Sequence, residues 1–111
     1  MKEMVVIITS GRQKEAKRLA RVLVEEKLAA CVNILPDVES NYWWKGRIES
    51  SQEWMLVVKT QEKMVQRIIE RVKEIHSYEV PEVIALPIVM GNRDYLQWIS
   101  DVLASRSQRG D

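Results

Sequence analysis

The chain has 111 residues, the length of one average globular domain, so a single domain is expected. Apolar residues make up 46% and charged residues 30% of it, a balance that supports a packed core and excludes a disordered chain. The formal net charge is only +1, which gives no electrostatic reason to expect nucleic acid or an anionic membrane as a partner.

The first apolar segment and the cysteine content both bear on the compartment. The run that begins at Met4 is about five residues long, which is too short for a signal peptide or a membrane span. Cys31 is the one cysteine in the chain, so an intrachain disulfide is excluded. We therefore expect a cytoplasmic protein.

The first third of the chain predicts a strand, a helix and a second strand. Residues 4–9 are almost continuously apolar and β-branched, as in a buried strand. Residues 16–28 carry apolar side chains at helical spacing, with charged residues on the opposite face. Residues 30–34 then alternate with a period of two, and Pro36-Asp37 is expected to interrupt or bend that strand.

The remaining segments follow in the order strand, strand, helix, strand, helix. Residues 40–45 and 54–58 predict a long antiparallel hairpin, with Gly46 near its turn. Thr60 is expected to cap a helix that ends near residues 75–76, and residues 83–89 predict the last strand. After Gly91, residues 95–102 predict a third helix.

This order predicts an α+β fold, a ferredoxin-like βαββαβ antiparallel sheet with an added C-terminal helix. We place one domain at residues 1–104 and a polar C-terminal tail at residues 105–111. Both main helices would cover one face of the sheet, yet residues 4–9 and 54–58 are apolar on both faces. The second face therefore needs a cover, and further subunits of a homo-oligomer are the expected one.

One polar turn concentrates the chemistry of the chain. Between a predicted helix and strand lie His76, Tyr78, Glu79 and Glu82, and His76 is the single histidine. Imidazole and carboxylate groups suit Cu(II) or another divalent cation, so His76, Glu79 and Glu82 are the candidate metal ligands. The alternative is a hydrogen-bonded histidine at a helix C-terminus. No nucleotide-binding, zinc-hydrolase or nucleophilic motif is present, so no enzymatic activity is expected.

Several motifs in order along the chain resemble the CutA family, the divalent-cation tolerance proteins. They are residues 29–33 (AACVN), 42–46 (YWWKG), 56–60 (LVVKT), 78–82 (YEVPE), 85–88 (ALPI) and 95–99 (YLQWI). The resemblance implies a homotrimer similar to the PII signalling proteins, binding of copper or another divalent metal, and no established reaction. The chain departs from the family pattern at Ser77, where a proline is usual. It also has Ile8 and Ile75 where some bacterial relatives have cysteine and histidine.

A second hypothesis keeps the trimer and changes the ligand. A PII-like signalling or scaffold trimer would bind a small anionic ligand or a partner protein in clefts between subunits. We assign Cys31, Trp43, Trp44, Lys59 and Tyr78 to such a cleft, because one cation beside an aromatic platform suits an anion. An RNA-binding module on the same fold is disfavoured, because the strand aromatics lie beside acidic as much as basic residues.

Overall fold

A computed structural model describes residues 2–107, and within them the chain forms four strands, three α-helices and one 3-10 helix. In chain order these are β1 (Glu3–Ser10), α1 (Gln13–Glu25), β2 (Cys31–Trp44), β3 (Arg47–Gln61), η1 (Glu62–Met64), α2 (Val65–Ile75), β4 (Val83–Pro87) and α3 (Arg93–Ser107). The strands form one antiparallel sheet in the order β2-β3-β1-β4. The predicted α+β class is confirmed.

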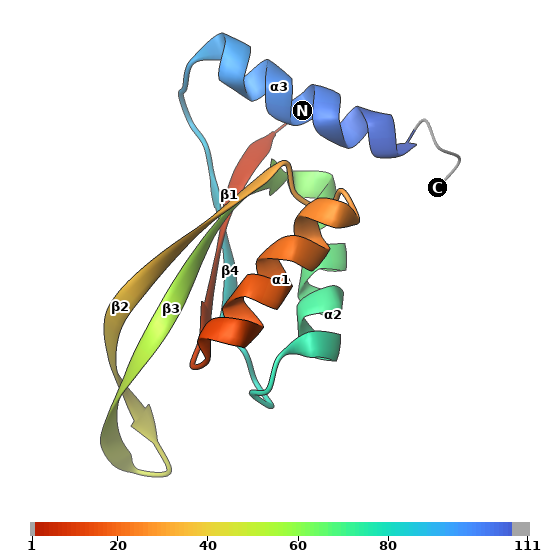
Figure 1. Cartoon of the computed structure of the whole chain (residues 1–111). Helices are drawn as coiled ribbons and strands as arrows, with labels where there is room; N and C mark the ends of the chain where they lie inside the picture. The colour runs from red at the N-terminus through yellow and green to blue at the C-terminus, as the bar shows by residue number, and fades with distance from the viewer. Residues whose placement is uncertain (1, 108–111) are drawn as a thin grey trace.

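The core lies between one face of the sheet and the two helices α1 and α2, which lie side by side on it (Figure 1). Alternate residues of the central strands are fully buried there because a strand turns every second side chain to the same face. These core residues are Val6 and Ile8 of β1, Leu56 and Val58 of β3, Leu19 and Leu23 of α1, and Ile68 and Val72 of α2. Helix α3 crosses one end of the sheet and adds Ile99 and Leu103.

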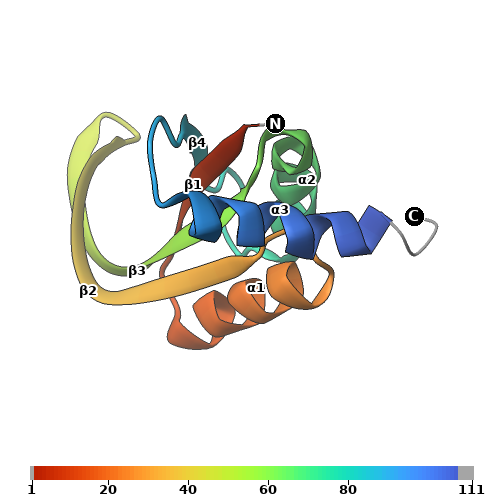
Figure 2. The ribbon, with the colours of Figure 1, turned by 90° about the horizontal axis from the view of Figure 1, so that it is seen from above.

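Strands β2 and β3 form one long hairpin that curls away from the helices (Figure 2). Its two-residue turn has Lys45 at φ 51° and Gly46 at φ 76°, the positive values that a type I′ turn requires. The predicted start of β3 at Trp54 is wrong, because the strand begins at Arg47. Residues 49–52 are polar and lie outside both predicted strands, yet they pair with β2 along an exposed part of the hairpin.

Three other boundaries differ from the prediction. Thr60 is still in β3, where its Oγ1 donates to the Leu28 carbonyl at 2.6 Å, so it does not cap the helix. Strand β4 ends at Pro87, two residues early, whereas α3 continues through Ser107 into the predicted tail. Residues 108–111 of that tail lie outside the described residues. Before α3, Asn92 Oδ1 accepts from the Asp94 amide at 2.9 Å, as in a helix cap.

The other face of the sheet carries no α1 or α2, and we call it the helix-free face. By register it presents Val5 and Ile7 of β1, Met55 and Val57 of β3, and Ile84 and Leu86 of β4. Ile84 and Leu86 keep 52% and 49% of their surface exposed, and Val89 and Met90 beyond β4 are more exposed still. A contiguous apolar surface of this kind marks an interaction site on a small domain.

No helix among the described residues combines the length and apolarity that crossing a membrane would require.

Candidate functional site

The turn of residues 76–82 is fixed to the end of β1 by its histidine. Nε2 of His76 lies 2.6 Å from the Thr9 carbonyl oxygen, and the Tyr78 amide donates to Nδ1 at 3.0 Å. Since Nδ1 accepts, Nε2 carries the proton and donates to Thr9. Both ring nitrogens of this buried histidine are therefore engaged, as in the hydrogen-bonded alternative considered for it from the sequence.

Glu15 of α1 fixes the next residue of the same turn. Its carboxylate accepts from the Ser77 amide and from the Ser10 hydroxyl, each at 2.8 Å. Burial alone would raise the pKa of Glu15, but these hydrogen bonds outweigh it and hold the pKa below its ordinary value. Glu15 Oε2 also lies 3.3 Å from Nδ1 of His76, so the two would form an ion pair on protonation of the ring.

Tyr78 joins the turn to the hairpin. Its hydroxyl donates to Oε2 of Glu53 at 2.7 Å, while the Ser40 hydroxyl donates to Oε1 at 2.6 Å. Burial, followed by the bond to Glu53, raises the pKa of Tyr78, which keeps the hydroxyl protonated as a donor. Gly11 makes room for this arrangement, because a Cβ there would lie 2.6 Å from the Tyr78 hydroxyl oxygen.

A β-bulge decides which hairpin side chains face this network. The register shifts between Leu35 and Val38, and Asp37 in the bulge has φ 60°. Because one extra residue is inserted, Leu35 and Val38 lie on the same face, and the even-numbered residues that follow stay on it. Tyr42 and Trp44 consequently join the helix-free face, whereas Trp43 lies on the opposite side.

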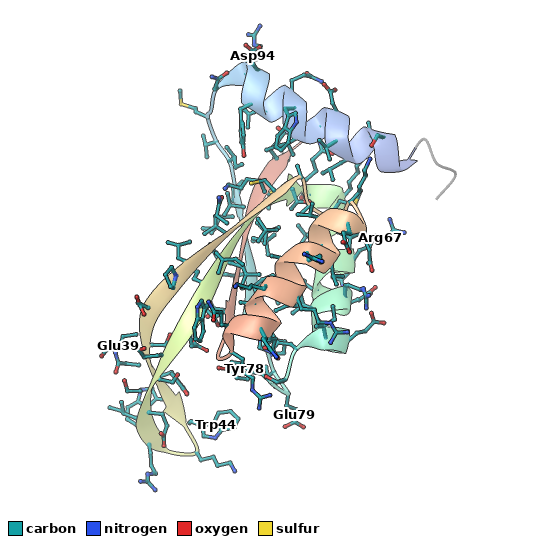
Figure 3. All side chains as sticks on the ribbon, viewed as in Figure 1. Glu39, Trp44, Arg67, Tyr78, Glu79 and Asp94 are labelled. Carbon is teal, nitrogen blue, oxygen red and sulfur yellow. The ribbon has the colours of Figure 1, made fainter. Side chains whose placement is uncertain are left out.

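The result is a cavity of about 670 Å³ at this end of the helix-free face, between the hairpin and the turn. Its lining includes three carboxylates and three aromatic rings, those of Glu53, Glu79, Glu82, Tyr42, Trp44 and Tyr78. No lysine or arginine is among the lining residues within the described chain. Figure 3 shows Trp44 on the hairpin and Tyr78 and Glu79 on the turn at the same end of the molecule. The cavity is therefore acidic and aromatic, and it attracts cations.

The three candidate metal ligands share the turn but do not converge. Glu79 is exposed, and the Thr9 hydroxyl donates to Glu82 at 3.5 Å. Among residues 2–107, no three His, Cys, Asp or Glu side chains lie close enough to hold a metal ion together. Metal binding by His76, Glu79 and Glu82 stays a prediction, and a complete site needs water or a further chain.

The residues assigned to the anion cleft are separated within one chain. Lys59 pairs with Cys31 at one end of the hairpin, and Trp43 and Trp44 lie beside its turn. At a rise of roughly 3.3 Å per residue, the strand between them is about 40 Å long. Tyr78 lies with Trp44 at the cavity. Within one chain these five residues therefore do not form one cleft.

A small polar group surrounds Lys59 at its own end of the helix-free face. Lys59 Nζ donates to Asn33 Oδ1, and Cys31 Sγ lies 3.9 Å from the same oxygen. Burial, and then the nearby Cys31 thiol, raise the pKa of Tyr95 in α3.

Sequence reasoning missed Glu53, Glu15 and Tyr42 as parts of this site. Glu53 opens an apolar segment and is only 6% exposed, so a carboxylate at the edge of an apolar run was the available signal. Tyr42 faces the cavity only because of the bulge. Glu15 reads as one charge among many on a solvated helix surface.

Comparison with known proteins agrees with the motifs. The family model described as CutA1 divalent ion tolerance protein matches residues 4–102. The chain is 48% identical to the divalent-cation tolerance protein CutA of Thermus thermophilus, over 89% of this chain and 96% of that one. It is also 48% identical to the chloroplastic protein CutA 1 of Oryza sativa, over 87% of this chain but only 55% of that protein. The chain thus spans little more than half the length of that plant relative.

Solved structures give the same result. The crystal structure of CutA1 from Oryza sativa superposes with a TM-score of 0.89 at 46% identity, covering 92% of this chain and 94% of that one. The protein CutA from Archaeoglobus fulgidus, described as periplasmic, superposes with a TM-score of 0.88 at 40% identity, covering 91% and 98%. With relatives described as chloroplastic and as periplasmic, a cytoplasmic location stays a prediction. By sequence and by fold, this chain belongs to the CutA1 family of divalent ion tolerance proteins.

Proposed function

We propose that this chain works as a homotrimeric divalent-cation tolerance protein, which binds copper or a similar divalent cation and catalyses no reaction. The observation that carries the proposal is the gathering of carboxylates beside the turn of residues 76–82 in a member of this family. Such a surface raises the local concentration of cations. The role would be a response to metal ions.

Of the proposed ligands, Glu79 and Glu82 need the least side-chain rearrangement to bind a metal ion, because neither is held by a strong internal hydrogen bond. Glu82 accepts only the 3.5 Å contact from Thr9. His76 must first release either the Tyr78 amide or the Thr9 carbonyl before a ring nitrogen can bind a metal. Since three ligands do not converge within residues 2–107, symmetry-related chains or water would complete the coordination.

The trimer is proposed from the surface of the subunit. We take the subunit as ferredoxin-like and the assembly as PII-like, with the helix-free face turned toward the neighbouring chains. Exposed Ile84 and Leu86 on that face, and Trp43 and Ile48 near the hairpin turn, are apolar side chains that association would bury.

Native mass spectrometry with Cu(II), Zn(II) and Ni(II) tests both parts. We expect a trimer that takes up a whole number of metal ions per assembly. Uptake should fall in the double variant Glu79→Gln/Glu82→Gln and stay unchanged in the matched variant Glu70→Gln on α2. A monomer would contradict the assembly, and uptake unaffected by the double variant would contradict the ligands. His76→Ala decides separately whether the imidazole takes part.

The small-anion hypothesis now requires a cleft formed between two chains. Lys59 is a cation on the helix-free face, and only a neighbouring chain could bring the hairpin tryptophans of a second copy to it. A thermal-shift screen of small organic anions checks this, because a bound ligand raises the melting temperature. Stabilisation that disappears in Lys59→Met would favour this hypothesis.

A further inference from the structure

The acidic, aromatic cavity has the size and lining of a site for a small molecule. Its volume of about 670 Å³ falls in the range of cavities that hold small ligands. We propose that it binds a small organic cation, an amine or guanidinium compound with more than one charged group. This goes beyond the divalent-cation role, because the ligand class and the residues that select it are different.

The spacing of the carboxylates argues for an extended cation. Carboxylates of Glu53, Glu79 and Glu82 line the cavity, yet no three acidic, histidine or cysteine side chains among residues 2–107 converge on one point. A metal ion needs its ligands within about 2–2.6 Å of a single centre. A diamine or polyamine carries its charges several ångströms apart, so it can reach carboxylates on the hairpin and on the turn at once.

The aromatic rings of the cavity favour an organic cation over a hydrated metal ion. Tyr42, Trp44 and Tyr78 line the cavity together. Alkylammonium and guanidinium groups bind over such rings, and tryptophan provides the strongest attraction. The ring of Trp44 already attracts a cation, since Nζ of Lys45 lies 6.0 Å from its centroid.

Glu53 lacks a counter-ion. Its residue surface is 6% exposed, and its two oxygens accept from the neutral hydroxyls of Ser40 and Tyr78. Within residues 2–107 it forms no ion pair, although burying a carboxylate without a cation is costly. Each oxygen still has a free lone pair, so a ligand ammonium group would complete the site.

Calorimetric titration of the full chain with spermidine tests the proposal, with glutarate as the anionic control. We expect saturable binding of spermidine, weakened by added salt, and none of glutarate. Trp44→Ala should weaken spermidine binding roughly tenfold. The matched variant Trp43→Ala should leave it unchanged, because Trp43 lies on the other side of the same hairpin. Glu53→Gln should weaken binding by a similar factor, and Tyr42→Ala provides a second cavity variant should Glu53→Gln fail to fold.

Two results would overturn the proposal. One is the absence of saturable spermidine binding, which is also expected if a basic side chain of a second copy fills the cavity. The other is equal weakening in Trp44→Ala and Trp43→Ala. Neither result decides the metal proposal, because the metal experiment depends on Glu79 and Glu82 and not on Trp44.

Discussion

The Tyr78 hydroxyl donates a hydrogen bond of 2.7 Å to Oε2 of Glu53, 25 residues away in the sequence. This contact ties the turn after α2 to the middle of β3, and the cavity lies between these two segments. The stronger this hydrogen bond is, the more firmly the two walls of the cavity are held together.

Removing the hydroxyl tests that contact. Tyr78→Phe leaves a buried carboxylate oxygen without its donor, which should lower the free energy of unfolding by about 1–3 kcal/mol. Urea denaturation measures this change in the free energy of unfolding. Tyr42→Phe is the matched control, because the Tyr42 hydroxyl lies 3.3 Å from Ser51 in an exposed pair and its removal should cost little. Equal losses in the two variants would contradict a special role for the Glu53 contact.

Gly11 should be needed because of Tyr78. In Gly11→Ala the new methyl group would lie 2.6 Å from the Tyr78 hydroxyl oxygen, so the ring must move and weaken its bond to Glu53. We expect a loss of about 1–3 kcal/mol. The loss should shrink in the Tyr78→Phe background, where neither the hydroxyl nor its bond remains. A double-mutant cycle measures this, and strictly additive losses would show that the two residues are independent.

We expect Glu15 to account for part of the loss of folding stability in acid. Its pKa is held below the ordinary value of 4.5, so the folded state binds a proton at this site less readily than the unfolded state. The carboxylate therefore contributes fully to stability above pH 4.5, and the contribution is lost as the pH falls through the lower folded value. Urea denaturation at several pH values should show wild type more stable than Glu15→Gln at neutral pH, with a gap that narrows in acid. A constant gap would contradict this assignment.

The fold was predictable from the sequence because its signals are local and repeated. The continuous apolar run of residues 4–9 marks a buried strand, and helical spacing in residues 16–28 marks the helix face that the core buries. The polar half of β3 was not predicted, because residues 49–52 have no apolar alternation, although they pair with β2. The site was predictable in part, since Tyr78, Glu79, Glu82 and Trp44 all line the cavity.

The bulge explains the rest of the difference at the site. Trp43 and Trp44 read as one aromatic platform in the sequence, but neighbouring strand residues point to opposite faces. Which of the two joins the cavity depends on the extra residue near Asp37, whose effect on register appears only in the paired strands. His76 stays a predicted metal ligand, but the sequence does not show that its ring donates a hydrogen bond to the Thr9 carbonyl, 67 residues away.

A substitution at Lys45 in the hairpin turn should stabilise the protein. Lys45 has φ 51° at a type I′ position, where asparagine is strongly favoured and lysine is not. Lys45→Asn should raise the free energy of unfolding by about 0.5–1 kcal/mol, a shift that urea denaturation resolves. An unchanged or lower stability would mean that the contact of Lys45 with the Trp44 ring outweighs the backbone strain.

The helix-free face is where the proposed assembly can be broken most directly. Leu86 lies opposite Val5 on this face and is 49% exposed in the single chain, so Leu86→Asp places a charge in any interface that covers it. Burying an unpaired carboxylate is costly enough to dissociate a small oligomer. Light scattering should give the mass of three 13.0 kDa chains for the native protein and of one for the variant. Val24→Asp on α1, a residue 41% exposed on the other side of the molecule, is the control and should stay trimeric. If both variants assemble normally, the helix-free face is not the interface.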